Sequence, residues 1–145
     1  MTPDLLIQRL DPEVPLPARA HPGDAGLDLT ARVDVEVAAG GRALVPTGIA
    51  IALPAGYVAL AVPRSGLALR DGATLLNSPG VIDAGYRGEV AAIVHNTGEQ
   101  PLHIRRGDRI AQLLVLQLPD VRVLEVATLP GTHRGVQGFG STGRA

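Results

Sequence analysis

Short runs in which polar and apolar residues alternate recur along the chain and are typical of β-strands. Residues 32–37 alternate strictly between charged side chains and valine, as expected for a strand with one buried face. Glycine, proline, asparagine and aspartate separate the runs and indicate turns. The pattern predicts strands over residues 32–37, 47–53, 57–62, 89–95, 109–118 and 121–126.

Helical periodicity is nearly absent, and only residues 65–69 are compatible with one short helix. Short strands at this spacing favour an all-β sandwich or barrel. Residues 77–88 are polar and punctuated by glycine, which predicts a long, shaped hairpin. We expect a β-barrel domain over residues 1–130 and a flexible, glycine-rich C-terminal arm over residues 131–145.

Composition narrows the class of protein. The 145 residues suffice for one domain, and a 46% apolar content that includes only three aromatic residues predicts an aliphatic core. The absence of cysteine excludes disulfides and thiolate metal sites. With 13 basic and 14 acidic residues, no broad positive field exists to bind nucleic acid. No apolar run approaches the ~18 residues of a membrane span, so we expect a cytoplasmic protein without a membrane or nucleic-acid partner.

Phosphate-binding chemistry is suggested directly after the predicted strand 57–62. Arg64, Ser65 and Gly66 offer a guanidinium, a hydroxyl and accessible backbone N–H groups, all of which suit phosphate oxygens. The same three residues also fit an ordinary turn with a solvated arginine.

Residues 80–88 contain the strongest candidate for a catalytic base. Their glycines let the backbone approach a ligand closely. Asp83 follows Val81 and Ile82, and an apolar setting is one in which a carboxylate can act as a general base. Tyr86 could present its ring to a sugar or a base. The alternative is a hairpin in which Asp83 only caps a turn.

Three further segments carry candidate side chains. Asp28 lies in a glycine-containing segment, where it could also be a simple turn residue. Gln112 is the only polar residue between positions 110 and 116, so it needs a hydrogen-bond partner, which the backbone could supply. Residues 134–143 combine an arginine, one aromatic ring and two hydroxyls, which suggests a lid over a phosphorylated, ring-containing ligand. The alternative is an unstructured terminus.

Taken together, these five segments resemble the five motifs of the homotrimeric dUTPase family, in the family's order. The match spans residues 25–143. The resemblance implies a distorted, jelly-roll-like β-barrel that hydrolyses dUTP to dUMP and pyrophosphate. This reaction keeps uracil out of DNA and supplies dUMP for dTMP synthesis. The segments are 25–29, 63–68, 80–88, 106–112 and 134–143.

The resemblance also implies roles in the chemistry. Asp83 activates water for in-line attack on the α-phosphorus. Mg²⁺ is held mainly by the triphosphate, and Asp28 reaches it through bound water. The phosphate oxygens are held by Arg64, Ser65, Gly66, Gln112, Arg134, Ser141 and Thr142.

On the nucleoside side, the resemblance implies that Tyr86 packs under the deoxyribose and leaves no room for a 2′-hydroxyl. Phe139 stacks on the uracil ring when the arm closes. Each site is shared within a homotrimer, and a neighbouring chain supplies the arm. The remaining residues implied at the uracil and deoxyribose are Asn77, Gly80, Val81, Ile82 and Gly140.

Two alternative functions remain at this stage. A dCTP deaminase shares the fold, but the short chain and the complete arm motif favour dUTP hydrolysis. A nucleotide-sensing regulatory module could use the same pocket without turnover. The presence of Asp83 argues against the second alternative, because binding alone does not need a general base.

Overall fold

The computed structural model describes residues 2–144, which form ten strands and one short helix. Residues 1 and 145 lie outside the described residues, the second of them in the predicted arm. The elements follow in the order β1 (Leu6–Arg9), β2 (Leu27–Thr30), β3 (Val35–Val37), β4 (Arg42–Ala52), β5 (Tyr57–Val62), α1 (Ser65–Asp71), β6 (Ala73–Leu75), β7 (Gly80–Asp83), β8 (Glu89–Asn96), β9 (Leu102–Ile104) and β10 (Arg109–Gln117).

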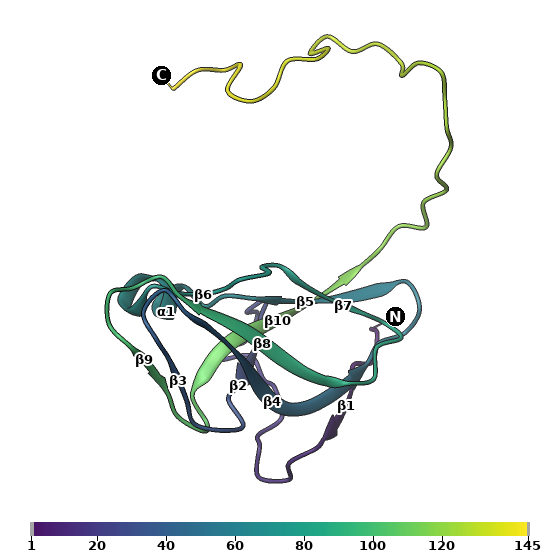
Figure 1. Cartoon of the computed structure of the whole chain (residues 1–145). Helices are drawn as coiled ribbons and strands as arrows, with labels where there is room; N and C mark the ends of the chain where they lie inside the picture. The colour runs from purple at the N-terminus through teal and green to yellow at the C-terminus, as the bar shows by residue number, and fades with distance from the viewer. Residues whose placement is uncertain (1, 145) are drawn as a thin grey trace.

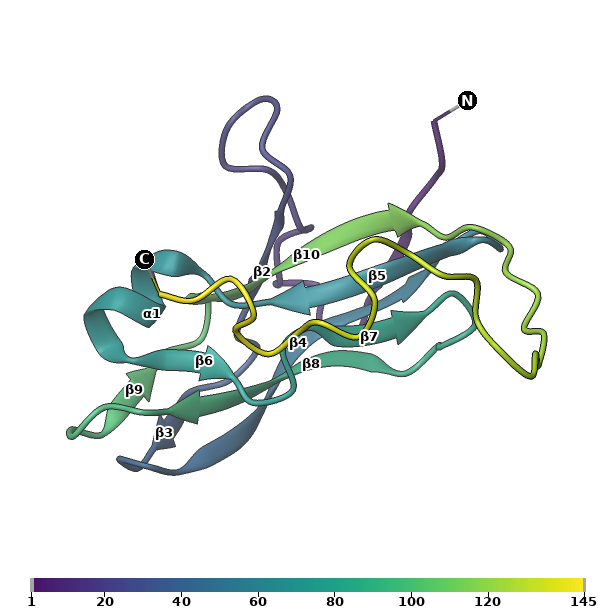
Figure 2. The ribbon, with the colours of Figure 1, turned by 90° about the horizontal axis from the view of Figure 1, so that it is seen from above.

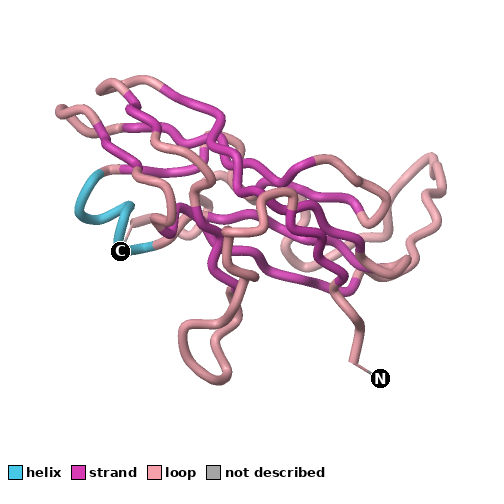
Figure 3. The backbone as a smooth tube through the Cα atoms, turned by 90° about the horizontal axis from the view of Figure 1, so that it is seen from below, coloured by secondary structure: helices cyan, strands magenta, loops and turns pink. Residues whose placement is uncertain are grey.

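Two four-stranded antiparallel sheets pack against each other (Figures 1 and 2). One has the strand order β1-β4-β8-β6 and the other β2-β10-β5-β7, while β3 and β9 form a separate pair. Aliphatic side chains from both sheets fill the space between them, among them Val45, Ile49 and Val90 from the first and Leu29 and Leu113 from the second. Strands dominate the body, with the helix at one end (Figure 3). The all-β class and the aliphatic core are confirmed.

The predicted strands match the structure where a neighbouring strand is available. The prediction for 57–62 coincides with β5, whereas 32–37 is reduced to β3 at its end. Within the hairpin predicted over 77–88, four residues form β7, which pairs with β5.

The predicted strand over residues 121–126 is wrong. After β10 the chain leaves the body, and no other strand lies beside this segment (Figure 1). Its apolar side chains, such as Val123, are exposed. A strand needs a neighbour for its N–H and C=O groups, and residues 2–144 of one chain supply none here.

The helix α1 follows β5 after only two residues and ends at a glycine. Gly72 has a φ of 64°, the left-handed conformation that terminates helices, and its N–H donates to the carbonyl of Ala68. The hydroxyl of Thr97 donates to the Gly72 carbonyl at 2.7 Å. The short helix predicted over 65–69 is therefore confirmed. No helix within residues 2–144 is long and apolar enough to cross a membrane.

A network of ion pairs ties the N-terminal segment to the body. Asp11 contacts Arg106 at 2.7 Å and Arg32 at 3.6 Å, and Arg32 also contacts Glu89 at 3.1 Å. The hydrogen bond from the Arg106 guanidinium is the main cause that lowers the pKa of Asp11 from 3.8 to about 2, and the backbone N–H of Glu13 adds to it. The network joins segments that are far apart in the sequence.

This lowered pKa predicts a defined pH dependence of stability. Because Asp11 is more acidic in the folded chain, its contribution is complete above its unfolded pKa of 3.8 and is lost as the pH falls towards about 2. Thermal unfolding of Asp11→Asn should therefore give a lower Tm than wild type at neutral pH, with the difference vanishing near pH 2. The exposed Asp120→Asn is the control. A Tm difference that stays constant down to pH 2 would contradict the assignment.

Candidate active site

The outward face of the sheet β2-β10-β5-β7 carries candidate residues in rows that cross the strands. Asp28 on β2 lies opposite Gln112 on β10, which lies opposite Val62 on β5. Residues that face each other across antiparallel strands point to the same side of a sheet. The register therefore places the Asp28 carboxylate and the Gln112 amide side by side.

A polar cleft of about 300 Å³ surrounds this first row, between β2, β10 and the start of α1. Two arginines hold Asp28 there: Arg64 Nε lies 3.2 Å from Oδ1, and Arg109 Nη1 lies 3.4 Å from Oδ2. Arg64 also donates from Nη1 to the carbonyl of Arg109 at 3.3 Å. Ser65 and Gly66 line the same cleft. The Arg64 guanidinium, the Ser65 hydroxyl and the start of the helix form a suitable site for phosphate oxygens.

The position of Gln112 depends on a close approach of the backbone. Its Nε2 donates to the carbonyl of Pro63 at 3.0 Å, which confirms that the amide finds a partner in the backbone. The carbonyl end of the amide packs directly on Gly26, where a Cβ would overlap the Gln112 Oε1. Gly26 is thus the residue that admits Gln112 to the cleft.

Gly26→Ala should therefore damage the cleft more than the fold. The added methyl displaces the Gln112 amide, a local overpacking that typically lowers stability by about 1–3 kcal/mol. Loss of the proposed contact between Gln112 and the phosphates should raise the KM for a triphosphate substrate roughly tenfold, since a hydrogen bond to a charged group contributes about 1.5–3 kcal/mol. Asp120→Asn is the control, because it changes an exposed side chain outside both cavities and outside the arm. An unchanged KM in Gly26→Ala would show that Gln112 does not bind the substrate.

A second cavity of about 300 Å³ lies between β7 and the edge of β8. Its lining combines apolar side chains with a few polar groups, which is typical of sites for small ring-containing molecules. Tyr86 is anchored by its hydroxyl, which donates to the carbonyl of Glu89 at 3.2 Å. The structure brings together here six residues that the sequence predicts at one site: Asn77, Gly80, Val81, Ile82, Asp83 and Tyr86.

The cleft and the second cavity are separate within one chain. Asp83 lies opposite Val58 on β5, four residues before Val62 in the row of Asp28. At about 3.3 Å per residue and 4.8 Å per strand, Asp83 is about 13 Å along the strands and about 14 Å across them from Asp28. Between the two lies an apolar row on the same face, Val81–Leu60–Leu114.

The predicted arm residues contact neither cavity. Residues 118–144 extend away from the body without a strand or helix (Figure 1). Phe139 has a relative exposure of 114%, which means that its ring touches almost nothing. The two cavities are lined without Arg134, Phe139, Gly140, Ser141 or Thr142.

Sequence reasoning missed two residues near Asp28. Arg109 is paired with Asp28, and Asp24 lines the cleft next to Ala25. Both lie beside predicted residues in the sequence, but nothing in their spacing shows their orientation. Arg106, from the same segment as Arg109, points instead into the ion-pair network around Asp11.

Comparison with known proteins identifies the family. The family model for dUTPase matches residues 12–143, almost the whole described chain. The chain belongs to the dUTPase family. It is 56% identical over 141 residues to the deoxyuridine 5′-triphosphate nucleotidohydrolase of Streptomyces coelicolor, which covers 97% of this chain and 77% of that protein. It is 55% identical over 139 residues to the same enzyme of Gloeobacter violaceus, which covers 94% of this chain and 95% of that protein.

Solved dUTPase structures share the fold. A point mutant of the Staphylococcus bacteriophage 80alpha dUTPase with dUpNHpp superposes with a TM-score of 0.91 at 26% identity, covering 97% of this chain and 99% of that one. A mutant dUTPase of phage phi11, described with a structural Mg(II) ion, superposes with a TM-score of 0.81 at 23% identity, covering 88% and 99%. The predicted jelly-roll-like fold of the dUTPase family is therefore confirmed.

Proposed function

We propose that this dUTPase-family chain hydrolyses dUTP to dUMP and pyrophosphate. The observation that carries the proposal is the presence in one chain of two complementary sites. One is a ring-sized cavity that ends at Asp83, and the other is a phosphate cleft around Arg64 and Gln112. Because the chain belongs to the dUTPase family, we assign one substrate, dUTP, to the cavity and the cleft together. Because deoxynucleoside triphosphates are made and used inside cells, the proposed substrate also favours a cytoplasmic enzyme.

The cavity under β7 would hold the deoxyuridine. The Asn77 amide and the backbone of 80–82 can hydrogen-bond the uracil edges. The Tyr86 ring, fixed through its hydroxyl to Glu89, would pack against the deoxyribose and exclude a 2′-hydroxyl. Phe139, followed by Gly140 in the arm, would stack on the exposed face of the uracil. Its exposure in the free chain means that the ring is available for this contact.

The cleft would hold the triphosphate. The Arg64 guanidinium, the Ser65 hydroxyl, the Gly66 backbone and the Gln112 amide would contact its oxygens. Arg109 does not line the cleft, in contrast to Arg64, so it would position Arg64 and Asp28 rather than contact the substrate. Arg134, Ser141 and Thr142 would join from the arm.

The donor set fits a Mg²⁺ ion that arrives with the nucleotide. Residues 2–144 contain no group of three or more His, Cys, Asp or Glu side chains placed to hold a metal. The cleft offers Asp28, held by two arginines, with Asp24 on its wall. Mg²⁺ commonly keeps several waters and binds through one or two carboxylates and substrate phosphates. Asp28 would hold its water shell, and the bound ion would neutralise phosphate charge.

Asp83 would perform the proton transfer. Its carboxylate would accept a proton from a water molecule, whose oxygen then bonds to the α-phosphorus. The bond from that phosphorus to the bridging oxygen breaks, and the electron pair leaves with pyrophosphate. Arg64 and Arg134 would stabilise the charge that develops on the phosphate oxygens.

We further propose that the complete site forms between copies in a homotrimer. The strand register of one chain places Asp83 about 19 Å from Asp28. At this distance the two carboxylates of one chain cannot both act at the same α-phosphate of one substrate. The apolar row Val81–Leu60–Leu114 lies between them on an outward face. A second copy that covers this row would bring its own cleft to the first copy's Asp83.

The test is an assay of pure protein against dUTP and the four standard deoxynucleoside triphosphates. We expect pyrophosphate release from dUTP alone and a dependence on added Mg²⁺. Ammonia release from dCTP would identify a deaminase instead. Tight binding of dUTP without turnover would identify a nucleotide sensor.

A further inference from the structure

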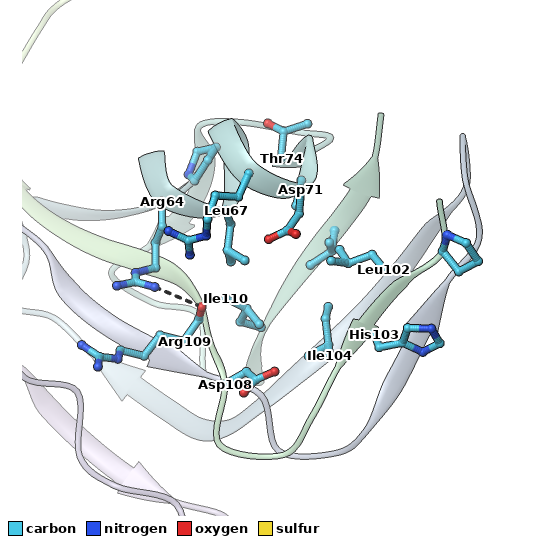
Figure 4. Close-up of a pocket in the computed structure, with 15 residues that line it drawn as sticks. Arg64, Leu67, Asp71, Thr74, Leu102, His103, Ile104, Asp108, Arg109 and Ile110 are labelled. Atoms are coloured by element: carbon cyan, nitrogen blue, oxygen red, sulfur yellow. Dashed lines mark hydrogen bonds between the residues drawn. The ribbon is translucent and has the colours of Figure 1, made fainter. Parts of the chain in front are cut away.

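A third cavity, about twice the volume of either cavity described above, has no role in the proposed reaction. It measures about 650 Å³ and lies between α1, β9 and the start of β10 (Figure 4). Arg64 lines both this cavity and the phosphate cleft. We name it the α1 cavity. A segment that covers phosphates bound at Arg64 therefore also lies next to the α1 cavity.

One carboxylate in the α1 cavity is available to a partner. Asp71, the last residue of α1, points into the cavity (Figure 4). No cation within residues 2–144 forms an ion pair with it. Arg64 and Arg109 on the opposite wall are both engaged with Asp28. The guanidinium of Arg70 folds back over Gly66, where its Nη1 would lie 3.1 Å from an added Cβ.

The other carboxylate of the α1 cavity is already used. Asp108 accepts the backbone N–H of Arg105 at 2.8 Å, which closes the turn before β10. His103 lies at the far wall and pairs with Glu36 at 3.2 Å. Arg64, Arg70 and Arg109 also line the cavity, together with apolar side chains such as Leu67 and Leu102. Asp71 is the lining carboxylate that no arginine or backbone N–H of the described residues engages, so it can accept a cation carried on an extended segment.

The end of the arm supplies a cation at the right distance. In the proposed closed state, Ser141 and Thr142 lie over the phosphates near Ser65. The seven residues of α1 span about 10 Å from Ser65 to Asp71, at 1.5 Å per residue. Three extended residues after Ser141 reach about 10 Å, so Arg144 can reach as far from Ser65 as Asp71 lies. Within the described residues, Arg144 forms no ion pair.

We propose that Arg144 of one copy docks in the α1 cavity of a neighbouring copy and pairs with Asp71. The pair holds the arm closed over the triphosphate. The inference rests on the proposed function, because the arm must first lie over the phosphates at Ser65. The pair of Arg144 and Asp71 is a contact in addition to those of the arm's phosphate-binding residues, and it lies in the α1 cavity rather than in the phosphate cleft.

The experiment measures arm closure rather than hydrolysis. Trypsin cleaves after arginine, so cleavage after Arg134, followed by mass spectrometry, reports an open arm. The protein is saturated with dUpNHpp, and the variants are D71N, R144Q, D71R, R144D and the double variant D71R/R144D. The exposed Arg42→Gln is the control for altered charge, and size-exclusion chromatography checks assembly.

With the analogue bound, we expect D71N and R144Q to be cleaved about 1.5–5-fold faster after Arg134 than wild type, as for an exposed ion pair, and D71R and R144D to be cleaved at least as fast as these. The double variant should return close to the wild-type rate. If wild type gains no protection from dUpNHpp, the proposed arm closure itself has failed. If wild type is protected and the single variants are protected equally, or the double variant is not rescued, the docking of Arg144 is wrong.

Discussion

Replacing Asp83 by asparagine should lower kcat for dUTP by roughly 10²–10⁴-fold, the usual contribution of a general base. The amide keeps the size of the side chain and its position on β7, but it cannot accept the proton from water. The affinity for dUpNHpp should change little, because the other residues of the cavity under β7, which would hold the deoxyuridine, are unaltered. Steady-state kinetics and calorimetric titration with the analogue measure the two quantities.

Asp120→Asn is the control, since it removes an exposed carboxylate outside both cavities. A kcat for Asp83→Asn within a few-fold of wild type would mean that another group activates the water. A comparable loss of binding and of kcat would instead make Asp83 a binding residue.

Deleting residues 131–145 should leave a folded, assembled protein that has lost at least about 10²-fold in kcat/KM. The deletion removes the arginine, the two hydroxyls and the ring that the arm is proposed to place on the substrate, and loss of even one preorganised donor often has an effect of this size. The body should be unaffected, because none of its strands or helix extends beyond Gln117.

Circular dichroism and size-exclusion chromatography compare the fold and the assembly of the deletion with wild type. Phe139→Ala in the full chain separates the ring from the phosphate contacts and should cause a smaller loss. Unchanged kcat/KM after the deletion would mean that the arm is a dispensable terminus.

The sequence predicts a strand most reliably where an apolar or alternating pattern coincides with the presence of neighbouring strands. β5 is found at its observed bounds because its residues are apolar and two strands flank it. Residues 121–126 have an equally strong pattern, yet they form no strand, since pairing depends on a neighbour that alternation cannot reveal. The short strands β6 and β9 have three residues each, too few to establish a period.

The candidate site is predictable in its composition but not in its assembly. The segments that contain Asp28, Arg64 and Gln112 meet in one cleft as expected. Which residue would hold Asp28 depended on the register of β2 and β10, and so Arg109 was missed. The separation of Asp83 from that cleft is likewise a consequence of register across β5, which no motif spacing contains.

Subunit complementation tests most directly whether the site forms between copies. Asp83→Asn and Arg64→Gln chains, each nearly inactive alone, are unfolded together, refolded as mixed trimers and assayed for dUTP hydrolysis. If Asp83 and Arg64 of one site come from different chains, an equal mixture should recover about a quarter of wild-type activity, because a quarter of its sites combine both intact residues. If both residues act from the same chain, every site contains one defect, and the mixture should remain as inactive as its components.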